Sequence, residues 1–424
     1  MSGTESSSNE AWRPKYLVEI DTEIEAPFGF SSHLLRGMKM KLHLFEPHSD
    51  LSTVDGWYEI TKQLTSWGEI PSDISSIEFK ATDRGPSYTI ITPENKWLAE
   101  VQPWGGPKIR PRARISPNHF DIPCGGFLYN EVELILLRRM KPEAPYALEV
   151  LTDHLQRNDM NSACELIQRC GQSLGEYHTL AKEEWTNPPD QRRWNERFHE
   201  IEARLKTTSL WRAPFTRAAP ATLDIGDVRF SMFSESLSGQ MAIKIGPSRL
   251  AHGLVETHFN LPGIRDLGSL LQDLSRQHYL TNTTLELSPL RAALIKGWRI
   301  TAPPSWCSRR SLSAHTGGSL IWEYEQSLLD VLEATSNQSG RPEPAVTLIE
   351  KVPNLQKKLF SARILSSGSW IFGIVGLLGT STWIKMAMED NFIFPTMPLV
   401  LFFVSYYLRN SYNRAAPPPE NPIH

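Results

Sequence analysis

Cysteine is scarce in this chain, with only 4 among 424 residues. Cys124, Cys164, Cys170 and Cys307 have neither the CxxC spacing nor the paired histidines of zinc sites. The sequence therefore indicates neither a disulfide framework nor a cysteine-based metal site. We expect all four thiols to be reduced and mostly buried.

The chain also lacks a strong excess of charge of either sign. Its formal net charge is -3 at pH 7, and basic residues are not concentrated over any whole domain. The first ten residues are polar and acidic and lack the apolar core of a secretory signal. These absences argue against a nucleic-acid partner and against export, so we expect the bulk of the chain to stay in the cytosol.

What the chain does have is length and apolar content. With 424 residues, 40% of them hydrophobic, it is long enough for two or three domains with a sizeable core. Within the N-terminal part, 15–26 and 38–45 alternate apolar and polar residues and predict two strands that pair as a hairpin. The predicted segments are a disordered tail over 1–12, a β-rich extension over 13–56, the two halves of a main domain over 57–150 and 151–335, a linker and basic helix over 336–365, a membrane hairpin over 366–410, and a proline-rich tail over 411–424.

The middle of the chain holds two short segments, 225–233 (IGDVRFSMF) and 240–246 (QMAIKIG). Together they resemble the catalytic centre of the aminoglycoside phosphotransferase-like family, a kinase fold. In that family the first segment reads HGDxxxxN, and the second ends in a hydrophobic residue, an Asp and a Gly. Gly226 and Asp227 match the first motif. The resemblance implies that Asp227 is the aspartate that accepts the proton of the substrate hydroxyl.

Three positions of this centre depart from the family. Ile225 replaces the His, Met232 replaces the Asn, and Lys244 takes the place of the metal-binding Asp. The family holds Mg²⁺ on the oxygens of that Asn and that Asp, and neither a thioether nor an ammonium can replace them. The resemblance therefore implies a pseudokinase that uses neither ATP nor Mg²⁺ as a cofactor and acts by binding.

Upstream, the resemblance implies the five-stranded small lobe of the family. Residues 60–67 predict a short helix, and 77–80 and 87–91 predict strands around the turn 83–86. A third strand is predicted over 96–101. In the family this strand carries a lysine that pairs with the ATP phosphates, and here that position falls on Glu100, whose carboxylate repels phosphate. The alternative is that Glu100 faces solvent as an ordinary strand residue.

Two further segments of this region carry charges. The run 127–140 (FLYNEVELILLRRM) has apolar residues at helical spacing and predicts a helix. The resemblance makes it the small-lobe helix, with Glu131 as the partner of the missing lysine; otherwise Glu131 simply faces water. Alternation places Lys108, Arg110, Arg112 and Arg114 on one face of an extended segment that meets anions, or else they belong to a solvated loop.

Downstream, two helices carry the resemblance further. A helix is predicted over 162–181, and its Leu-Gly-Glu-Tyr-His run at 174–178 resembles a Leu-Gly-x-x-His run of the family. We expect His178 to be a structural core residue. The run 261–271 is similar to the family helix whose Asp braces the catalytic loop, which makes Asp266 the structural brace of the degenerate centre. A purely local helix cap is the alternative for Asp266.

The C-terminal part has a different character. A linker over 336–344 and a basic amphipathic helix over 347–364 lead into two apolar runs, 370–387 and 392–408. Basic residues flank the outer ends, whereas the turn between the runs carries only acids, so both termini are predicted to be cytoplasmic. A re-entrant or interface-lying hairpin is the alternative. Small residues at 369, 373, 376 and 380 would let the two helices, or a partner's helix, approach closely.

The sequence therefore predicts an α+β, two-lobed protein kinase-like fold followed by a two-helix transmembrane hairpin, in a bacterial inner membrane or a photosynthetic membrane. The favoured function is a membrane-anchored, cytosol-facing pseudokinase-type binding or scaffold protein with a membrane or peripheral protein partner. One alternative is an atypical phosphotransferase that uses ATP, with Asp227 as base and Asp224, Ser231 or Glu235 as substitute metal ligands. The other is an assembly factor for a membrane complex.

Overall fold

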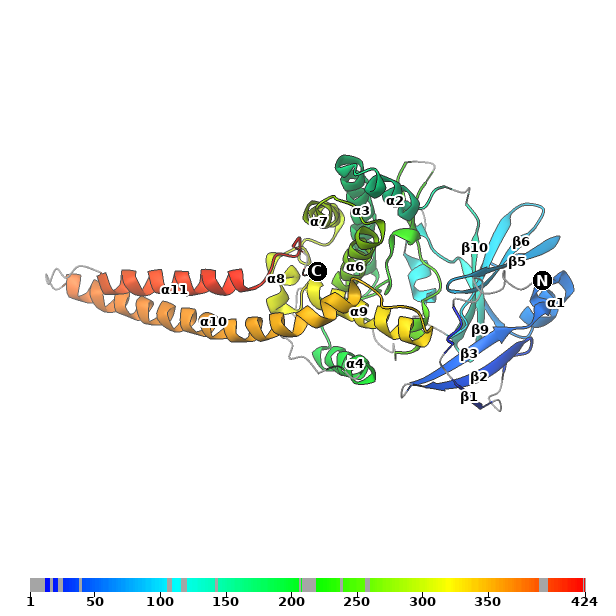
Figure 1. Ribbon diagram of the computed structural model, residues 1–424, viewed down its shortest axis with the longest axis horizontal. Helices are drawn as coiled ribbons and strands as arrows, with labels where there is room; N and C mark the ends of the chain where they lie inside the picture. Colours follow the sequence, from blue (N-terminus) through cyan, green and yellow to red (C-terminus); the bar gives the residue numbers. More distant parts are fainter. Residues whose placement is uncertain are drawn as a thin grey trace.

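The computed structural model describes residues 12–15, 18–21, 26–37, 40–104, 109–115, 120–141, 144–205, 207, 219–236, 239–255, 260–388, 396–421 and 423. A β-rich half and a helical half form a mixed α/β body, and two long helices project from the helical half as a stalk (Figure 1). The chain order follows this division, because the strands come first and the stalk comes last.

A small antiparallel sheet opens the chain. It consists of β1 (Val18–Asp21), β2 (Phe30–Gly37) and β3 (Met40–Pro47), in the order β1-β2-β3. The predicted hairpin between 15–26 and 38–45 is wrong, because β2 lies between them and pairs with both. The preceding segment reaches the helical half, where the Lys15 backbone N–H donates to the Ser336 carbonyl at 3.0 Å. Trp12 packs against Trp104, with ring centroids 6.2 Å apart.

A six-stranded antiparallel sheet forms the rest of the β-rich half. Its strands are β4 (Thr65–Gly68), β5 (Ser76–Thr82), β6 (Gly85–Ile91), β7 (Lys96–Val101), β9 (Gly125–Tyr129) and β10 (Val132–Arg139), in the order β4-β9-β10-β7-β6-β5. The predicted strands at 77–80, 87–91 and 96–101 are confirmed. The helix predicted over 60–67 is displaced: η1 (Ser49–Ser52) and α1 (Val54–Thr61) precede β4, and Trp57 of α1 packs edge-on against Phe127 of the sheet.

The helix predicted over 127–140 is wrong, because this run forms β9 and β10. Asn130 and Glu131 make the turn between them with positive φ angles of 46° and 65°. Residues 134–137 are all fully buried, so the strand has no polar face. A strand buried on both sides shows the same unbroken apolar run as a buried helix, which is why the pattern misled. Glu131 therefore lies at an exposed turn, where it pairs with Arg110.

Arg110, Arg112 and Arg114 do not share one face, contrary to the extended-segment prediction. Residues 110–114 form a 3-10 helix, η2 (Arg110–Arg114), and β8 (Phe120–Asp121) pairs in parallel with a strand of the helical half. Arg112 is buried and donates to the Asp224 carbonyl at 2.8 Å, whereas Arg114 lies at the surface near Glu184. Lys108 lies outside the described residues.

The helical half packs α3 along α7 and α6 along α9 (Figure 1). Its helices are α2 (Ala147–Gln156), α3 (Met160–Glu184), α4 (Gln191–Arg204), α5 (Leu250–Gly253), α6 (Gly263–Thr281), α7 (Leu287–Thr301), α8 (Arg309–Leu312) and α9 (Ser319–Ser336), with the 3-10 helices η3 (Phe230–Met232) and η4 (Ala314–Thr316). The short strands are β11 (Thr186–Asn187), β12 (Ala221–Thr222), β13 (Phe233–Glu235) and β14 (Met241–Lys244). The predicted helices over 162–181 and 261–271 are confirmed by α3 and α6.

The stalk consists of α10 (Ala345–Met388) and α11 (Thr396–Ala415), which runs back along α10. The basic helix and the first apolar run are thus one helix, about 66 Å long at 1.5 Å per residue. Ser369 and Ser405 join the two helices, each hydroxyl donating to the other residue's carbonyl at 2.9 and 2.7 Å. Gly373 and Gly376 face α11 at the same contact, so the small-residue stripe serves packing within the chain. The acidic turn over 389–391 lies outside the described residues.

The proline-rich tail is ordered against the body, contrary to expectation. Arg291 of α7 donates to the Pro419 carbonyl at 2.9 Å, and the Ser288 hydroxyl donates to the Glu420 carbonyl at 3.1 Å. Ile423 packs against the core of the helical half. The tail therefore returns the end of α11 to the body, and both ends of the stalk are tied to it.

Candidate functional site

The loop that carries Asp227 is held by α6. Gly226 adopts a φ of 99°, a conformation that suits glycine. The buried Asp266 carboxylate accepts the backbone N–H groups of Ile225 and Gly226, both at 2.8 Å. His178 lies 3.1 Å from the same carboxylate and accepts the Trp298 indole N–H on its other ring nitrogen at 2.9 Å. Asp266 thus fixes the loop from the core, and His178 is the core residue that the sequence predicts.

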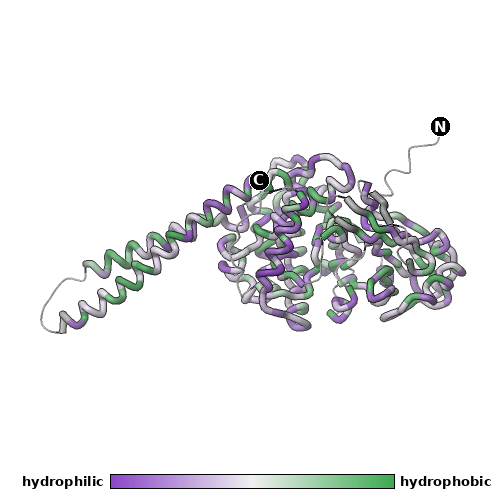
Figure 2. Tube along the Cα trace, turned by 90° about the horizontal axis from the view of Figure 1, so that it is seen from below, coloured by the Kyte–Doolittle hydropathy of each residue, from purple (hydrophilic) through white to green (hydrophobic). Residues whose placement is uncertain are grey.

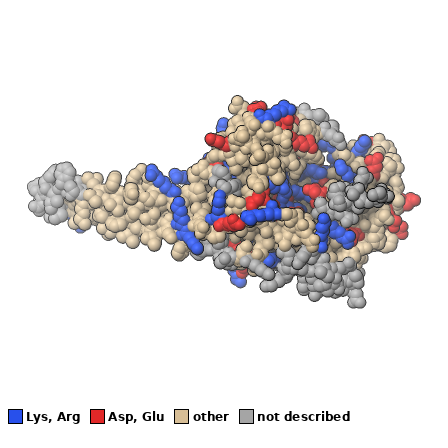
Figure 3. Space-filling view, in the orientation of Figure 1, with Lys and Arg blue, Asp and Glu red and all other residues tan. Residues whose placement is uncertain are grey.

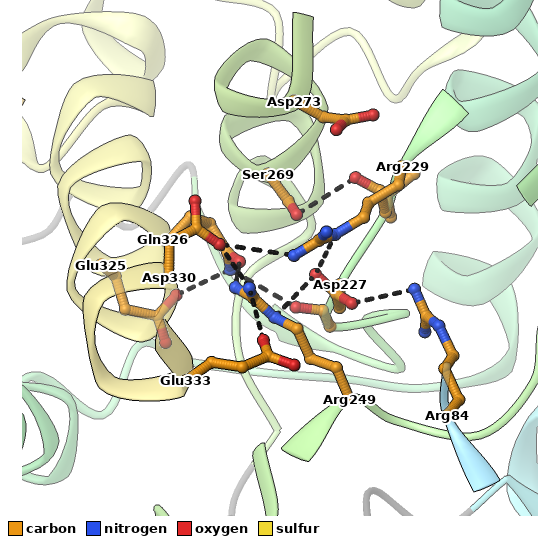
Figure 4. A network of polar contacts seen from close by, with 12 residues as sticks. Arg84, Asp227, Arg229, Arg249, Ser269, Asp273, Glu325, Gln326, Asp330 and Glu333 are labelled. Atoms are coloured by element: carbon orange, nitrogen blue, oxygen red, sulfur yellow. Dashed lines mark hydrogen bonds and ion pairs between the residues drawn. The ribbon is translucent and has the colours of Figure 1, made fainter. Parts of the chain in front are cut away.

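Three arginines from separate parts of the chain surround Asp227 (Figure 4). Arg84, from the turn between β5 and β6, lies 3.1 Å from one carboxylate oxygen, and Arg229 and Arg249 each lie 3.2 Å from the other. Burial alone would raise the pKa of Asp227, but the three guanidinium groups hold that pKa well below its ordinary value. A carboxylate with so low a proton affinity is a poor general base.

Acidic and amide groups of α9 hold two of these arginines in turn (Figure 4). Arg249 pairs with Asp330, lies 3.1 Å from Glu333 and donates to the Gln326 side-chain oxygen at 3.1 Å. Arg229 lies 3.4 Å from the same Asp330. Each guanidinium is therefore shared between Asp227 and α9, so the Asp227 ion pairs form a closed network within the protein.

Glu100 of β7 and Lys244 of β14 form a second ion pair, with 2.9 Å between the ammonium and a carboxylate oxygen. Arg138 of β10 lies 2.7 Å from the other oxygen of Glu100. Burial alone would raise the pKa of Glu100, but Arg138 and Lys244 outweigh it and bring that pKa to about 2. Glu100 is only 8% exposed, so the alternative that it faces solvent is wrong.

The structure thus brings together two positions that the resemblance singles out from segments 144 residues apart, since 244 − 100 = 144. An acid stands where the resemblance implies a lysine, and a lysine stands where it implies an acid. The two form one ion pair with exchanged charges. Arg138 also belongs to this cluster. The sequence did not predict it, because the run 127–140 predicts a helix and Arg138 lies in β10.

The substitute metal ligands considered from the sequence do not converge. Asp224 is buried, accepts the Leu261 backbone N–H at 3.1 Å and pairs with Arg265. Burial and the neighbouring Asp266 raise the pKa of Asp224. Ser231 and Glu235 are exposed, and Glu235 pairs with Arg169 at the surface. Within the described part of the chain, no group of three or more His, Cys, Asp or Glu side chains is placed to hold a metal ion. Asp224, Ser231 and Glu235 are therefore not placed to share one Mg²⁺ ion.

Comparison with known proteins finds kinases of similar structure but no match by sequence. No family model matches the chain, and no curated protein matches it. A glucosamine kinase in complex with glucosamine, ADP and inorganic phosphate is 12% identical, with a TM-score of 0.48, over 78% of this chain and 93% of that chain.

Two further solved structures are less similar. The choline kinase from Streptococcus pneumoniae has a TM-score of 0.31 at 12% identity, over 66% of this chain and 92% of that chain. A Ralstonia eutropha protein named provisionally as an aminoglycoside phosphotransferase has a TM-score of 0.37 at 10% identity, over 72% and 94%. The chain is thus a mixed α/β protein with kinase-like structural neighbours. At these scores and identities the likeness establishes neither activity nor substrate.

Proposed function

We propose that this protein is a pseudokinase-type binding protein, in which a kinase-like body transfers no phosphoryl group and the stalk anchors the body at a membrane. The observation that carries the proposal is the 2.9 Å contact between Glu100 and Lys244. A phosphotransferase of the resembling family needs a free cation here for phosphates and a free anion for Mg²⁺. In this chain the two charges have exchanged places and neutralise each other.

The position of the β5–β6 turn supports the same proposal. Arg84 donates to the Pro247 carbonyl at 2.9 Å and pairs with Asp227, so the turn is drawn down onto the loop. In the resembling family this turn covers ATP, and the aspartate receives a substrate proton. Here Arg84 of the turn occupies one oxygen of the Asp227 carboxylate, which a substrate hydroxyl would also have to contact.

The test measures ATP binding to the full chain in detergent. Calorimetry and thermal shift are both carried out with and without Mg²⁺. We expect neither heat nor a change in Tm, with an ATP-binding kinase as the positive control for the assay. The Arg84→Ala variant, which frees Asp227 from the turn, gives the same negative result if Glu100 and Lys244 are what exclude the nucleotide. Mg²⁺-dependent binding by the wild-type chain overturns the proposal and favours an atypical phosphotransferase.

Membrane anchoring is supported by the surface of the stalk. One helix of the described residues, over Ala345–Lys385, is long and apolar enough to cross a membrane by length and composition. The outer part of the stalk is mostly hydrophobic, and hydrophilic residues lie nearer the body (Figure 2). Large apolar side chains are exposed on both stalk helices: Ile364, Trp370, Ile371, Ile374, Leu377, Leu378, Leu399, Val400, Phe403, Tyr406 and Tyr407. Exposed apolar surfaces of this kind are typical of sites that contact lipid or a partner protein.

The lengths and charges fit a stalk that enters the membrane from the cytosolic side. Residues 366–388 extend about 34 Å as a helix, close to the thickness of a bilayer's hydrocarbon core. Lys357, Lys358 and Arg409 lie at the body end, which is the cytosolic end under the positive-inside rule. A bacterial inner membrane or a photosynthetic membrane suits this arrangement. Resistance to carbonate extraction, together with protease access to the body from the cytosolic side, is the expected result; release by carbonate contradicts insertion.

A further inference from the structure

Six basic side chains lie on the elements that meet where the stalk leaves the body. We call this set the basic collar: Arg309 and Arg310 of α8, Lys357, Lys358 and Arg363 of α10, and Arg409 of α11. We propose that the basic collar binds the headgroups of anionic phospholipids and so holds the body against the membrane surface. This inference rests on the membrane anchoring proposed above.

The α10 part of the collar faces outward. Val352, Leu359 and Ala362 line the buried face of the helix, whereas Lys357 and Lys358 are exposed. Residues 351–388 include Lys and Arg but no Asp or Glu, and neither do residues 396–419. The preceding acid of α10, Glu350, is already paired with Arg341 at 3.1 Å. The positive charge of α10 is therefore not cancelled along its own helix.

Contacts within the protein fix Arg409 of the collar beside α10. Arg409 donates to the Ser366 hydroxyl at 3.2 Å, and its guanidinium lies 5.4 Å from the Tyr412 ring centroid. That ring stacks on His315 of η4, with centroids 3.9 Å apart. Burial lowers the pKa of His315, and the nearby charges of Arg363 and Arg409 lower that pKa further. Both arginines therefore lie close to His315.

Contacts of η4 also connect the base of the stalk to α8. His315 lies on η4, and the Thr316 hydroxyl donates to the Arg310 carbonyl, so η4 holds α8 beside the base of the stalk (Figure 1). Arg309 and Arg310 have exposed side chains. On the face seen in Figure 3, Lys and Arg side chains gather where the stalk leaves the body. The collar is thus built from three elements whose mutual positions are fixed.

The neighbours of the collar favour a lipid surface over a soluble anion. Exposed Phe360 and Ile364 lie among its charges on α10, and exposed Trp370 and Tyr406 follow on the side of the apolar surface. Aromatic residues concentrate at the membrane interface, next to the headgroups. A helix that exposes lysines and apolar side chains at this level matches a bilayer interface, where phosphates and acyl chains adjoin.

The experiment uses the full chain in detergent micelles, titrated with phosphatidylglycerol or with phosphatidylcholine, and native mass spectrometry counts the bound lipids. We expect at least tenfold tighter binding of phosphatidylglycerol, weakening with added salt because headgroup attraction is screened. The variant Lys357→Gln/Lys358→Gln/Arg310→Gln loses roughly fivefold in affinity per charge removed. The matched variant Lys62→Gln/Lys80→Gln/Lys96→Gln, with exposed lysines on the β-rich half, keeps the preference.

Equal binding of the two lipids, or an unchanged preference in the collar variant, overturns the proposal. Competition by millimolar inorganic phosphate that removes all bound phosphatidylglycerol also overturns it, because the collar is then a site for free anions. If the wild-type chain is released by carbonate, both the anchoring and the collar proposals fail. If the chain resists carbonate but shows no lipid preference, only the collar proposal fails.

Discussion

The loop around Asp227 and the stalk depart from the usual distribution of side chains in opposite directions. The body buries ions: Glu325, Arg197 and Arg265 are at most 2% exposed. The stalk exposes large apolar residues such as Leu377 and Phe403. In the body every one of these charges has a partner within the protein, whereas the apolar surface of the stalk has none among the described residues. The contrast points to the stalk, and not the loop around Asp227, as the part that needs another molecule.

The largest effect is expected where the buried ions of the body are unbalanced. Glu325 lies 2.8 Å from both Arg197 and Arg265. The substitution Glu325→Leu leaves two buried guanidinium groups facing each other and should cost about 3–5 kcal/mol of unfolding free energy. Urea unfolding followed by circular dichroism measures it. The exposed Glu78→Leu serves as control, and a loss below about 1 kcal/mol would mean that solvent reaches this network.

A charge placed on the stalk should act on the membrane and not on the body. Leu377→Arg puts a guanidinium on the exposed apolar surface of α10 and should disfavour insertion by about 3 kcal/mol. We expect a large fall in the carbonate-resistant fraction, with the Tm of the body unchanged. Ile70→Arg replaces an exposed apolar residue of the body and should leave the fraction as it is. If Leu377→Arg stays membrane-bound, the exposed surface of α10 is not what holds the protein there.

The exchanged ion pair makes the stability of the body depend on pH. The pKa of Glu100 falls from 4.5 to about 2 on folding, so the carboxylate contributes stability above about pH 4.5 that is lost as the pH falls toward 2. Glu100→Gln should remove about 2 kcal/mol at pH 7 and flatten the dependence between pH 5 and 3. Urea unfolding at pH 3, 5 and 7 tests this. The exposed Glu59→Gln is the matched control, and an unchanged slope in Glu100→Gln would assign the acid sensitivity to other carboxylates.

The sequence could place Asp227, Glu100 and Lys244 because each stands in or beside a short motif with a fixed order along the chain. It could place the helix of Asp266 for the same reason, since its apolar residues recur at helical spacing. These are local signals, and the described structure agrees with them at the level of strands and helices. Features that a local pattern encodes can therefore be predicted from the sequence.

The remaining members of the cluster are joined by long-range contacts that no local pattern encodes. Arg84 and Asp227 are 143 residues apart. Arg138 was missed for another reason: its strand is buried on both faces, and the unbroken apolar run before it was assigned to a helix. The ordered tail was missed because proline-rich composition predicts disorder, whereas its carbonyls find donors in Arg291 and Ser288.

The smallest effect is expected at Arg84, which, among the described residues, links the Asp227 network to the β-rich half. Its side chain is 17% exposed, and Arg229 and Arg249 remain on Asp227 when it is removed. Arg84→Ala should therefore cost only about 1 kcal/mol, while it frees the β5–β6 turn from the loop. Amide hydrogen exchange should rise at residues 82–85 and hardly change in α6 or α10. Arg157→Ala, which removes the exposed pair with Asp153, is the control and should leave these amides unchanged. Because Arg84→Ala removes the contacts with both Asp227 and Pro247, unaltered exchange would mean that the sheet itself holds the turn closed, and the body would then exclude ligands by its strands and not by its charges.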